Sequence, residues 1–248
     1  MTTARLDRLL GNLGYGSRKE IQRLAAAGRV VLDGAAVTDA ARRVPVSADL
    51  PQRMTVAGAP VDPPAPLTLM MHKPLGVVCS HKEDGERVYD LLPARWRARD
   101  PALSTIGRLD KETSGLLLIT DDGPLLHRVI SPKANVPKRY RATLDRPLRG
   151  GEAAVFAAGG LMLEGEDKPL LPAVLEPISP TEVWLTVTEG RYHQVRRMFA
   201  AVGNHVTSLC RDRVGGLALP EDLEPGRWRI LSRAEIDVIF TAGQPAQT

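Results

Sequence analysis

The chain has 248 residues, of which 43% are hydrophobic and 25% charged, and its formal net charge is +4 at pH 7. This composition is ordinary for a globular protein, and the absence of a run of about 18 apolar residues excludes a membrane-spanning segment. Several charged side chains fall within residues 1–20, so we expect no signal peptide and a cytoplasmic location. The two cysteines are expected to be reduced, and the histidines and cysteines lack the spacing of a structural zinc site.

The positive charge is concentrated at the amino-terminal end. Residues 1–60 contain nine Lys or Arg and five Asp or Glu, which accounts for the whole net charge of +4. The rest of the chain is therefore electrically balanced. This asymmetry predicts a small module that binds a polyanion, attached to a larger and nearly neutral domain.

Residues 1–58 predict two short helices followed by a hairpin. Leucines at positions 6, 9, 10 and 13 have helical spacing, and Ser17-Arg18-Lys19-Glu20 is a capping box that starts a second helix. Asp33-Gly34 is typical of the turn of a hairpin over residues 29–37. The basic side chains expected on the surface of this module are Arg5, Arg8, Arg18, Lys19 and Arg23. They are either ordinary solvated charges or contacts to RNA phosphates.

A proline-rich segment separates this module from the rest of the chain. Residues 58–66 contain four prolines, too many for a helix or a central strand. We therefore predict an amino-terminal domain at 1–58, a semi-rigid linker at 59–66 and a larger domain at 67–240. The polar tail at 241–248 is expected to be disordered.

The larger domain is predicted to be rich in strands, with a few helices. Helical patterns occur at 125–130, from about Tyr192, and at 232–240, and the strand patterns are at 67–73, 116–119, 138–144, 182–188 and 205–219. Strands and helices do not alternate as they do in a parallel sheet, and no glycine-rich phosphate loop occurs. The expected fold class is α+β, with a small helix-and-hairpin module before a domain built on a mixed, largely antiparallel sheet.

One stretch, residues 107–120, combines charge and tight turns. Arg108 and Asp110 lie between Gly107 and Gly115, directly ahead of a short apolar run that predicts a buried strand. Glycine allows tight turns and the close approach of another chain. Asp110 either points into a cleft at the rim of a sheet or satisfies the backbone of the turn, and the spacing favours neither alternative.

Two further residues of the larger domain have a structural and a functional alternative. Tyr140 belongs to an alternating strand pattern that puts it opposite Arg139 and Arg141, so it is either half-buried core or a platform for a nucleobase. Lys73 precedes the turn at Pro74–Gly76. It could contact a phosphate, but the sequence favours simple exposure.

The helix predicted from about Tyr192 carries two arginines with different surroundings. On a helical wheel Val195, Met198, Phe199 and Val202 form one apolar stripe. Arg196 lies at the edge of this stripe, where partial burial requires a carboxylate partner, and Asp110 is the candidate. Arg197 lies nearly opposite, where it can stay in solvent or contact a phosphate.

Several of these motifs occur in one order along the chain. The amino-terminal 45 residues or so resemble the S4 RNA-binding module. Across residues 4–240 the chain resembles the RsuA-type pseudouridine synthases. The motifs that carry this resemblance are His72-Lys73-Pro74-Leu75-Gly76, the stretch from Gly107 to Thr120, Lys138-Arg139-Tyr140, and the stretch from Glu189 to Met198.

The resemblance implies an enzyme that converts a uridine in ribosomal RNA to pseudouridine, without a metal or cofactor. Asp110 would be the catalytic carboxylate, and Tyr140 would stack on the target uracil. Arg196 would pair with Asp110 and keep it ionised, and Arg108 would help to hold the flipped nucleotide. The residue types suit this chemistry, because an opposite charge favours an ionised carboxylate and the uridine must leave the helix to be reached. Lys73 and Arg197 join the amino-terminal cations as expected RNA contacts.

The resemblance also bears on the target. Residues 168–178 and 190–205 are most similar to the enzyme that acts on small-subunit (16S) rRNA, whereas Tyr89 to Pro93 is more similar to large-subunit (23S) enzymes. A protein from another class, an inactive rRNA-binding assembly factor, would be recognised by loss of Asp110, Tyr140 or Arg196. All three are present. We expect a monomer that binds 16S rRNA or a small-subunit assembly intermediate and does not bind membranes.

Overall fold

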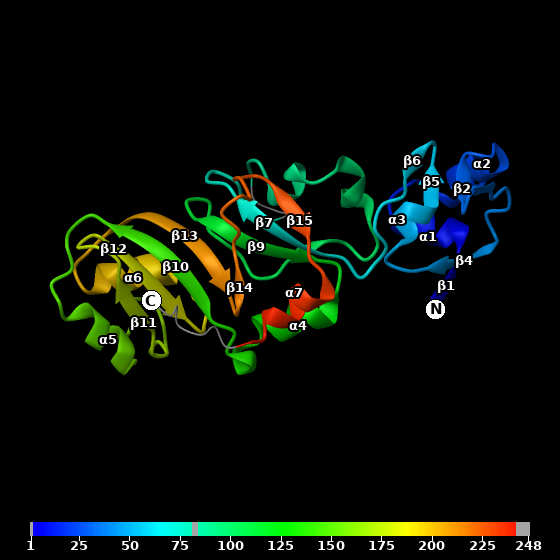
Figure 1. The fold of residues 1–248 in the computed structure, drawn as a ribbon. Helices are drawn as coiled ribbons and strands as arrows, with labels where there is room; N and C mark the ends of the chain where they lie inside the picture. Colours follow the sequence, from blue (N-terminus) through cyan, green and yellow to red (C-terminus); the bar gives the residue numbers. More distant parts are fainter. Residues whose placement is uncertain (1, 81–83, 242–248) are drawn as a thin grey trace. The chain divides into compact units, whose positions relative to one another are not determined.

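The computed structural model describes residues 2–80 and 84–241, and the chain forms two compact units (Figure 1). The first unit contains the chain up to Thr68 together with Leu92–Ser104 and Thr120–Gly123. The second contains Leu69–Leu91, Thr105–Ile119 and the chain from Pro124 onward. Within the described ranges, no helix has the length and apolar character needed to cross a membrane. The predicted disordered tail lies outside these ranges, apart from Thr241.

The first unit contains the two predicted helices and the predicted hairpin. Its helices are α1 (Leu6–Asn12), α2 (Arg18–Ala26), α3 (Leu50–Arg53) and the 3-10 helix η2 (Ala94–Ala98). Its strands are β1 (Thr2–Arg5), β2 (Val30–Leu32), β3 (Ala35–Ala36), β4 (Arg43–Val46), β5 (Met54–Val56) and β6 (Ala59–Pro60). The capping box is confirmed, since Ser17 and Glu20 each accept a hydrogen bond from the other's backbone N–H. The leucines of α1 and Ile21 of α2 form the core with residues of the sheet.

The proline-rich segment continues into this unit. Ala59–Pro60 adds β6 to the four-stranded sheet β3-β2-β5-β6, and Val61 is buried. The backbone N–H of Asp62 donates to the Tyr15 hydroxyl at 3.0 Å, and the Asp62 carboxylate pairs with Arg95 of η2 at 2.7 Å. The Arg95 guanidinium also lies 4.1 Å from the centre of the Tyr15 ring. These contacts fix the start of the segment and η2 to the helices of the first unit.

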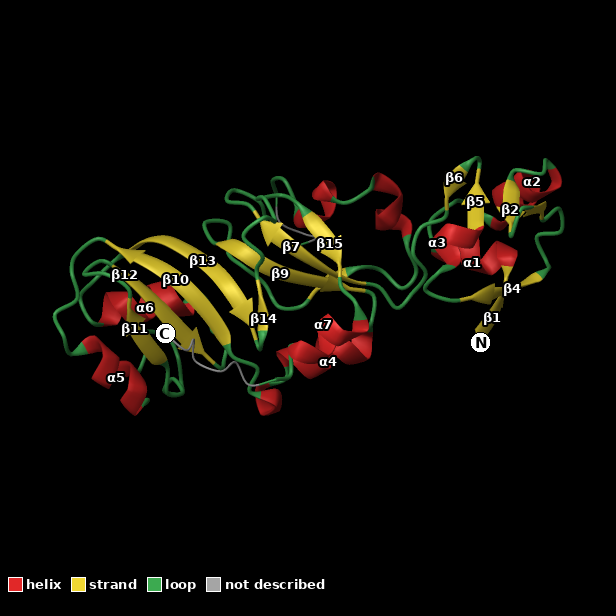
Figure 2. Cartoon of the chain, in the orientation of Figure 1, coloured by secondary structure: helices red, strands yellow, loops and turns green. Residues whose placement is uncertain are grey.

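The second unit is built on one mixed sheet of nine strands (Figure 2). The strand order is β11-β12-β10-β13-β9-β7-β15, with β14 beside β13 and β8 beside β9. The bounds are β7 (Thr68–Lys73), β8 (Ser104–Thr105), β9 (Ser114–Thr120), β10 (Lys138–Leu144), β11 (Val174–Pro177), β12 (Glu182–Val187), β13 (Val206–Val214), β14 (Leu217–Ala218) and β15 (Trp228–Ile230). Strands β9 and β13 are parallel, whereas β10 is antiparallel to both β12 and β13. The predicted α+β class, with a mixed and largely antiparallel sheet, is confirmed.

Helices pack on this sheet, and the described residues between them form apolar clusters. The helices are α4 (Gly123–Ile130), α5 (Glu152–Ala158), α6 (Gln194–Ala201) and α7 (Arg233–Val238), with the 3-10 turns η1 (Val88–Leu91) and η3 (Pro132–Ala134). Phe156 of α5 meets Phe199 of α6 edge to face, with ring centroids 5.4 Å apart, against strands β10, β12 and β13. Helix α6 begins at Gln194 and not near Tyr192 as predicted, because His193 adopts a left-handed conformation with φ of 48°.

The parallel pairing of β9 with β13 explains one of the glycines around Asp110. Gly115 pairs with Arg211 in the parallel ladder. A Cβ at Gly115 would lie 2.2 Å from the Arg211 carbonyl oxygen, which no side chain tolerates. The glycine therefore lets β13 approach the strand that follows the Asp110 loop, as expected of a glycine at a close backbone contact.

Candidate active site

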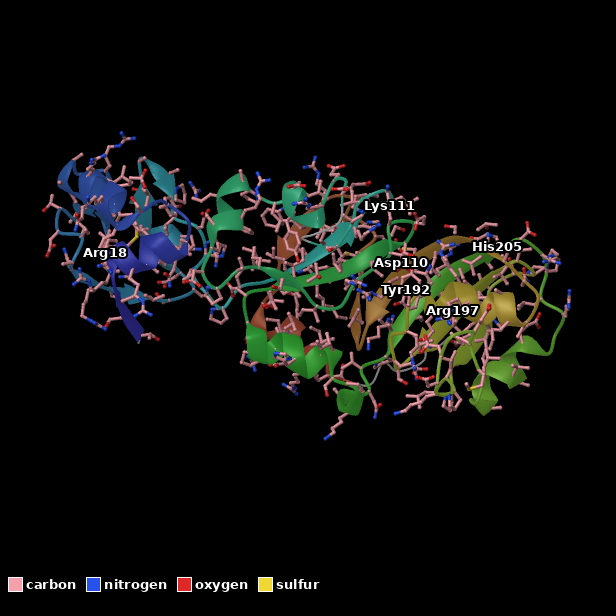
Figure 3. All side chains as sticks on the ribbon, turned by 180° about the vertical axis from the view of Figure 1, so that it is seen from behind. Arg18, Asp110, Lys111, Tyr192, Arg197 and His205 are labelled. Atoms are coloured by element: carbon pink, nitrogen blue, oxygen red, sulfur yellow. The ribbon has the colours of Figure 1, made fainter. Side chains whose placement is uncertain are left out.

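A cavity of about 1010 Å³ lies in the second unit, beside the loop that carries Asp110. Four segments line it: residues 106–110, strand β10 with Lys138 and Tyr140, strand β13 with Leu209 and Arg211, and the stretch 187–195. Lys168, Pro169 and Leu171 complete one side. Asp110 and Tyr192, which both line the cavity, are seen close together in Figure 3. The cavity brings three of the four expected substrate residues together, namely Arg108, Asp110 and Tyr140.

The backbone of Asp110 closes the turn, while its side chain lines the cavity. Its backbone carbonyl accepts the Thr113 N–H at 3.0 Å and closes the turn. Its side chain is 31% exposed, lines the cavity and lies 3.4 Å from the His193 ring, between Oδ1 and Nε2. The backbone turn therefore leaves the carboxylate available to a ligand.

Lys73 holds the loop that carries Asp110 through hydrogen bonds inside the protein. The sequence favoured an exposed lysine, but the side chain is fully buried, which corrects both that expectation and the expected RNA contact. Its ammonium donates to the carbonyls of Thr113 at 2.9 Å and Pro74 at 3.0 Å. Burial lowers the pKa of Lys73, while Cys79, Asp110 and Glu112 act in the opposite direction. The lysine is buried because loop carbonyls converge on it, an arrangement that the local sequence does not reveal.

Arg196 does not form the expected ion pair with Asp110. Its guanidinium donates from Nη1 to the Val206 carbonyl and from Nη2 to the Glu112 carbonyl, both at 2.9 Å. Among the described residues, the side chain that lies against the Asp110 carboxylate is the His193 ring, with Nε2 3.4 Å from Oδ1. The wheel correctly placed Arg196 at a half-buried edge, but carbonyl oxygens satisfy it there in place of a carboxylate. The Arg196 side chain thus contacts the Asp110 loop at a backbone carbonyl of that loop, and not at the Asp110 carboxylate.

Arg197 is held in a charged network and is not a freely solvated cation. Its Nη1 pairs with Glu166 at 2.9 Å and donates to the Tyr192 carbonyl at 3.1 Å. Glu166 also pairs with Arg191 at 2.8 Å, and the two arginines hold the pKa of Glu166 below its usual range. Arg197 is half-buried in this network, and its expected contact with RNA stays a prediction. The network ties the segment around Glu166 to the start of α6.

Strand β10 presents different faces to the cavity and to Trp184. Tyr140 and Lys138 line the cavity, while Arg139 and Arg141 lie over Trp184, with guanidinium carbons 4.3 and 6.0 Å from its ring centre. This confirms the predicted alternation. Burial and the charge of Arg211 lower the pKa of Lys138 to about 8.

Sequence reasoning missed four residues that line the cavity: Lys138, Arg211, Tyr192 and His193. Arg211 is buried, donates from Nε to the Leu116 carbonyl at 2.9 Å and lies 6.0 Å from the Tyr140 ring centre. The strand alternation that selected Tyr140 places Lys138 on the same face, so that signal was present. The positions of Arg211, Tyr192 and His193 depend on the pairing of β9 with β13 and on the left-handed turn at His193.

The amino-terminal cations lie at the surface of the first unit. Arg5, Arg8, Arg18, Lys19 and Arg23 are all exposed. The buried Asp7 carboxylate pairs with Arg5 at 2.7 Å and lies 3.6 Å from Arg18. Hydrogen bonding from Arg5 holds the pKa of Asp7 below its usual value. Asp7 therefore remains charged and orients two cations that stay accessible to a polyanion.

Exposed cations in the first unit suit a polyanion, and a carboxylate, aromatic rings and cations around one cavity of the second unit are typical of an enzyme site. Residues 68–201 match the RNA pseudouridylate synthase family, and residues 4–50 match the S4 domain. The first match spans more than half of the chain. The chain belongs to the RNA pseudouridylate synthase family, and the predicted isomerase class and S4-type module are confirmed.

Relatives resemble this chain over nearly its whole length. Ribosomal small subunit pseudouridine synthase A of Vibrio cholerae is 42% identical, over 95% of this chain and 99% of the relative. The protein of the same name from Escherichia coli K12 is also 42% identical, over 94% and 98%. A solved structure described as a pseudouridylate synthase is 35% identical, with a TM-score of 0.66 over 95% of this chain and 99% of that one.

Proposed function

We propose that this protein converts one uridine of small-subunit rRNA to pseudouridine, with Asp110 as the catalytic carboxylate. The observation that carries the proposal is the position of Asp110, whose backbone closes a turn while its half-buried side chain lines a cavity with Tyr140. The full-length similarity to small-subunit synthases of two bacteria supports the choice of rRNA.

The reaction rearranges one nucleotide. The N1–C1′ bond breaks, the uracil turns, and C5 bonds to C1′, while C5 loses a proton and N1 gains one. Asp110 acts at the junction of sugar and base, either as a nucleophile on the ring or as a base that removes a sugar proton. A base inside a helix is out of reach of such a carboxylate, so the uridine is extruded into the cavity. We assign Tyr140 to stacking on the uracil and Arg108 to holding the flipped nucleotide, since both line the cavity.

The first unit supplies affinity for RNA. Its exposed cations Arg8, Lys19 and Arg23 are available to phosphates, and the S4 match covers all three positions. In this proposal the first unit grips the RNA backbone, while the cavity of the second unit selects and converts the uridine.

The test maps pseudouridine in both rRNAs of cells that lack this protein, with the intact gene and variants reintroduced. We expect one position of the small-subunit rRNA to lose pseudouridine and to regain it with the wild-type chain. Asp110→Asn should not restore it, whereas Glu112→Gln, an equal loss of charge in the same loop, should. If pseudouridine is instead lost at a position of the large-subunit rRNA, the substrate is 23S rRNA and not 16S rRNA. Full restoration by Asp110→Asn would refute the catalytic assignment, and no change in either rRNA would refute the activity.

A further inference from the structure

Tyr192 is an aromatic side chain placed in solvent at the catalytic cavity. It is 68% exposed, and every other Phe, Tyr and Trp of the chain is buried or half-buried. It lines the cavity that also contains Asp110 and Tyr140. Figure 3 shows Tyr192 beside Asp110. Burial of an aromatic ring is favourable, so an exposed ring at the edge of this cavity is available to stack on a ligand.

One face of the Tyr192 ring is covered by His193, and His193 also contacts the catalytic carboxylate of Asp110. The Tyr192 and His193 rings stack with centroids 3.9 Å apart and an interplanar angle of 14°. The same imidazole places Nε2 3.4 Å from Oδ1 of Asp110. Since His193 covers one face, the large exposure of Tyr192 leaves the opposite face open. A flat group stacked there would lie one ring beyond the residue that contacts Asp110.

Hydrogen bonds and ion pairs hold the backbone around Tyr192 in place before any ligand binds. His193 adopts a left-handed conformation, which is uncommon for a residue with a side chain and persists where neighbours impose it. The Tyr192 carbonyl accepts from Arg197, and the Arg191 N–H donates to the Gln194 side chain at 2.9 Å. Glu166 pairs with both Arg191 and Arg197. A rigid aromatic ring loses little conformational freedom when a ligand stacks on it.

The cavity has room for more than one nucleotide. Its volume of about 1010 Å³ is at the upper end of the range for sites that enclose a drug-sized ligand. Tyr140, on β10, and Tyr192, before α6, are two separate aromatic surfaces of this cavity. Every nucleobase has a π-face, so stacking on a protein ring suits any neighbour of the target uridine. The exposed Lys168 lines the same cavity and suits a phosphate.

We propose that Tyr192 is a second base-binding subsite, on which the nucleobase adjacent to the target uridine stacks, with His193 joining this platform to Asp110. The inference rests on the proposed function, because it assumes an RNA strand whose uridine occupies the cavity. In this arrangement the platform holds the strand next to the extruded nucleotide, and Tyr140 holds the uracil itself.

The test is a double-mutant cycle on a synthetic small-subunit rRNA fragment centred on the mapped uridine. The protein carries Tyr192→Ala, and the RNA has its base removed at the nucleotide before or after the target. Affinity is measured in an Asp110→Asn background, so that turnover is not needed. We expect Tyr192→Ala to weaken binding of intact RNA by about 10-fold or more, in line with the loss of one base stack. At one of the two flanking positions, base removal should abolish the effect of the variant.

Two control variants separate stacking from general damage. Tyr192→Phe keeps the ring and should bind within about 2-fold of the parent, within ordinary scatter for such changes. Ile178→Ala removes an exposed apolar side chain that does not line the cavity and should bind like the parent. Independent effects of Tyr192→Ala and base removal at both flanking positions would overturn the platform, as would unchanged affinity of Tyr192→Ala. Neither result touches the proposed function, which fails only if the wild-type enzyme forms no pseudouridine.

Discussion

Arg196 holds the Asp110 loop by the loop's backbone, since its Nη2 donates to the carbonyl of Glu112, two residues beyond Asp110, at 2.9 Å. The other arm of the guanidinium donates to the Val206 carbonyl at the start of β13. The arginine thereby bridges α6, β13 and the loop that carries Asp110. In the proposed reaction it would act by positioning this loop.

This bridge predicts a selective kinetic defect. Arg196→Met should lower kcat by about 10- to 100-fold, because small displacements of a reacting group are costly, while KM changes little. Arg196→Lys should recover only part of the rate, because an ammonium cannot span both carbonyls in a fixed fork. Single-turnover and steady-state kinetics on the rRNA fragment measure both constants. Arg233→Gln, an exposed arginine of α7, is the matched control. A defect confined to KM would contradict positioning.

Lys73 predicts a stability defect. Replacing it by Met removes the ammonium that satisfies the carbonyls of Thr113 and Pro74 inside the protein. Leaving buried acceptors without a donor costs about 1–3 kcal/mol. The free energy of unfolding of Lys73→Met, measured with urea, should therefore be lower than that of the wild type by at least that amount. Lys111→Met, at an exposed lysine of the same loop, should leave the free energy of unfolding unchanged. Equal midpoints for Lys73→Met and the wild type would contradict the anchoring role.

Lys138 predicts how stability depends on pH. Its pKa is lowered from 10.5 to about 8 by burial and by Arg211. Between about pH 8 and 10.5 the unfolded chain keeps a proton that the folded chain releases, so stability from this residue rises with pH across that window. Below about pH 8 the ammonium is charged in both states and its burial is unfavourable.

Replacing Lys138 by Met should therefore stabilise the fold at pH 7, by up to about 3 kcal/mol, because its pKa is lowered by about 2.5 and each pKa unit corresponds to about 1.4 kcal/mol. The gain should shrink as the pH rises toward 10.5, because the folded wild-type lysine is then neutral and no longer buries a charge, while the unfolded lysine is still about half protonated. Urea unfolding at pH 7, 9 and 10.5 measures this trend, with the exposed Lys133→Met as the control. A gain of equal size at every pH would show that packing and not charge is responsible.

The surface cations of the first unit predict the salt dependence of RNA binding. Replacing Arg8, Lys19 and Arg23 together by Gln should weaken binding and reduce the slope of log K against log salt by about 2, if each neutralises one phosphate. The measurement is a titration of the rRNA fragment between low and physiological salt.

The matched control removes the same charge from the second unit, at Lys133, Arg146 and Arg233, all of which are exposed. This triple variant should keep the slope of the wild type to within about 0.5, because counterion release is counted only for cations that meet phosphates. Equal slopes for the two triple variants would contradict a specific grip by the first unit.

Sequence patterns predicted the elements well where the decisive contacts are local. The capping box at Ser17 and Glu20 involves residues three apart, and the alternation that faces Tyr140 toward the cavity follows from the pleat of one strand. The start of α6 was wrong by about two residues, because the left-handed turn at His193 has no signature in its residue type. Exposure of Lys73 was wrong because the oxygens that surround it come in part from Thr113, 40 residues away.

The sequence by itself determined the family, the order of the S4-type module and the synthase part, and the face on which Tyr140 lies. Residue types in a fixed order and the periodicities of helix and strand are enough for those conclusions. Only the tertiary structure decided what each charged group contacts. A helical wheel gives the side toward which Arg196 points, but its partner is an atom of Glu112, 84 residues away. That Asp110 faces His193, and that Tyr192 stands in solvent behind it, follows from how distant segments pack around one cavity.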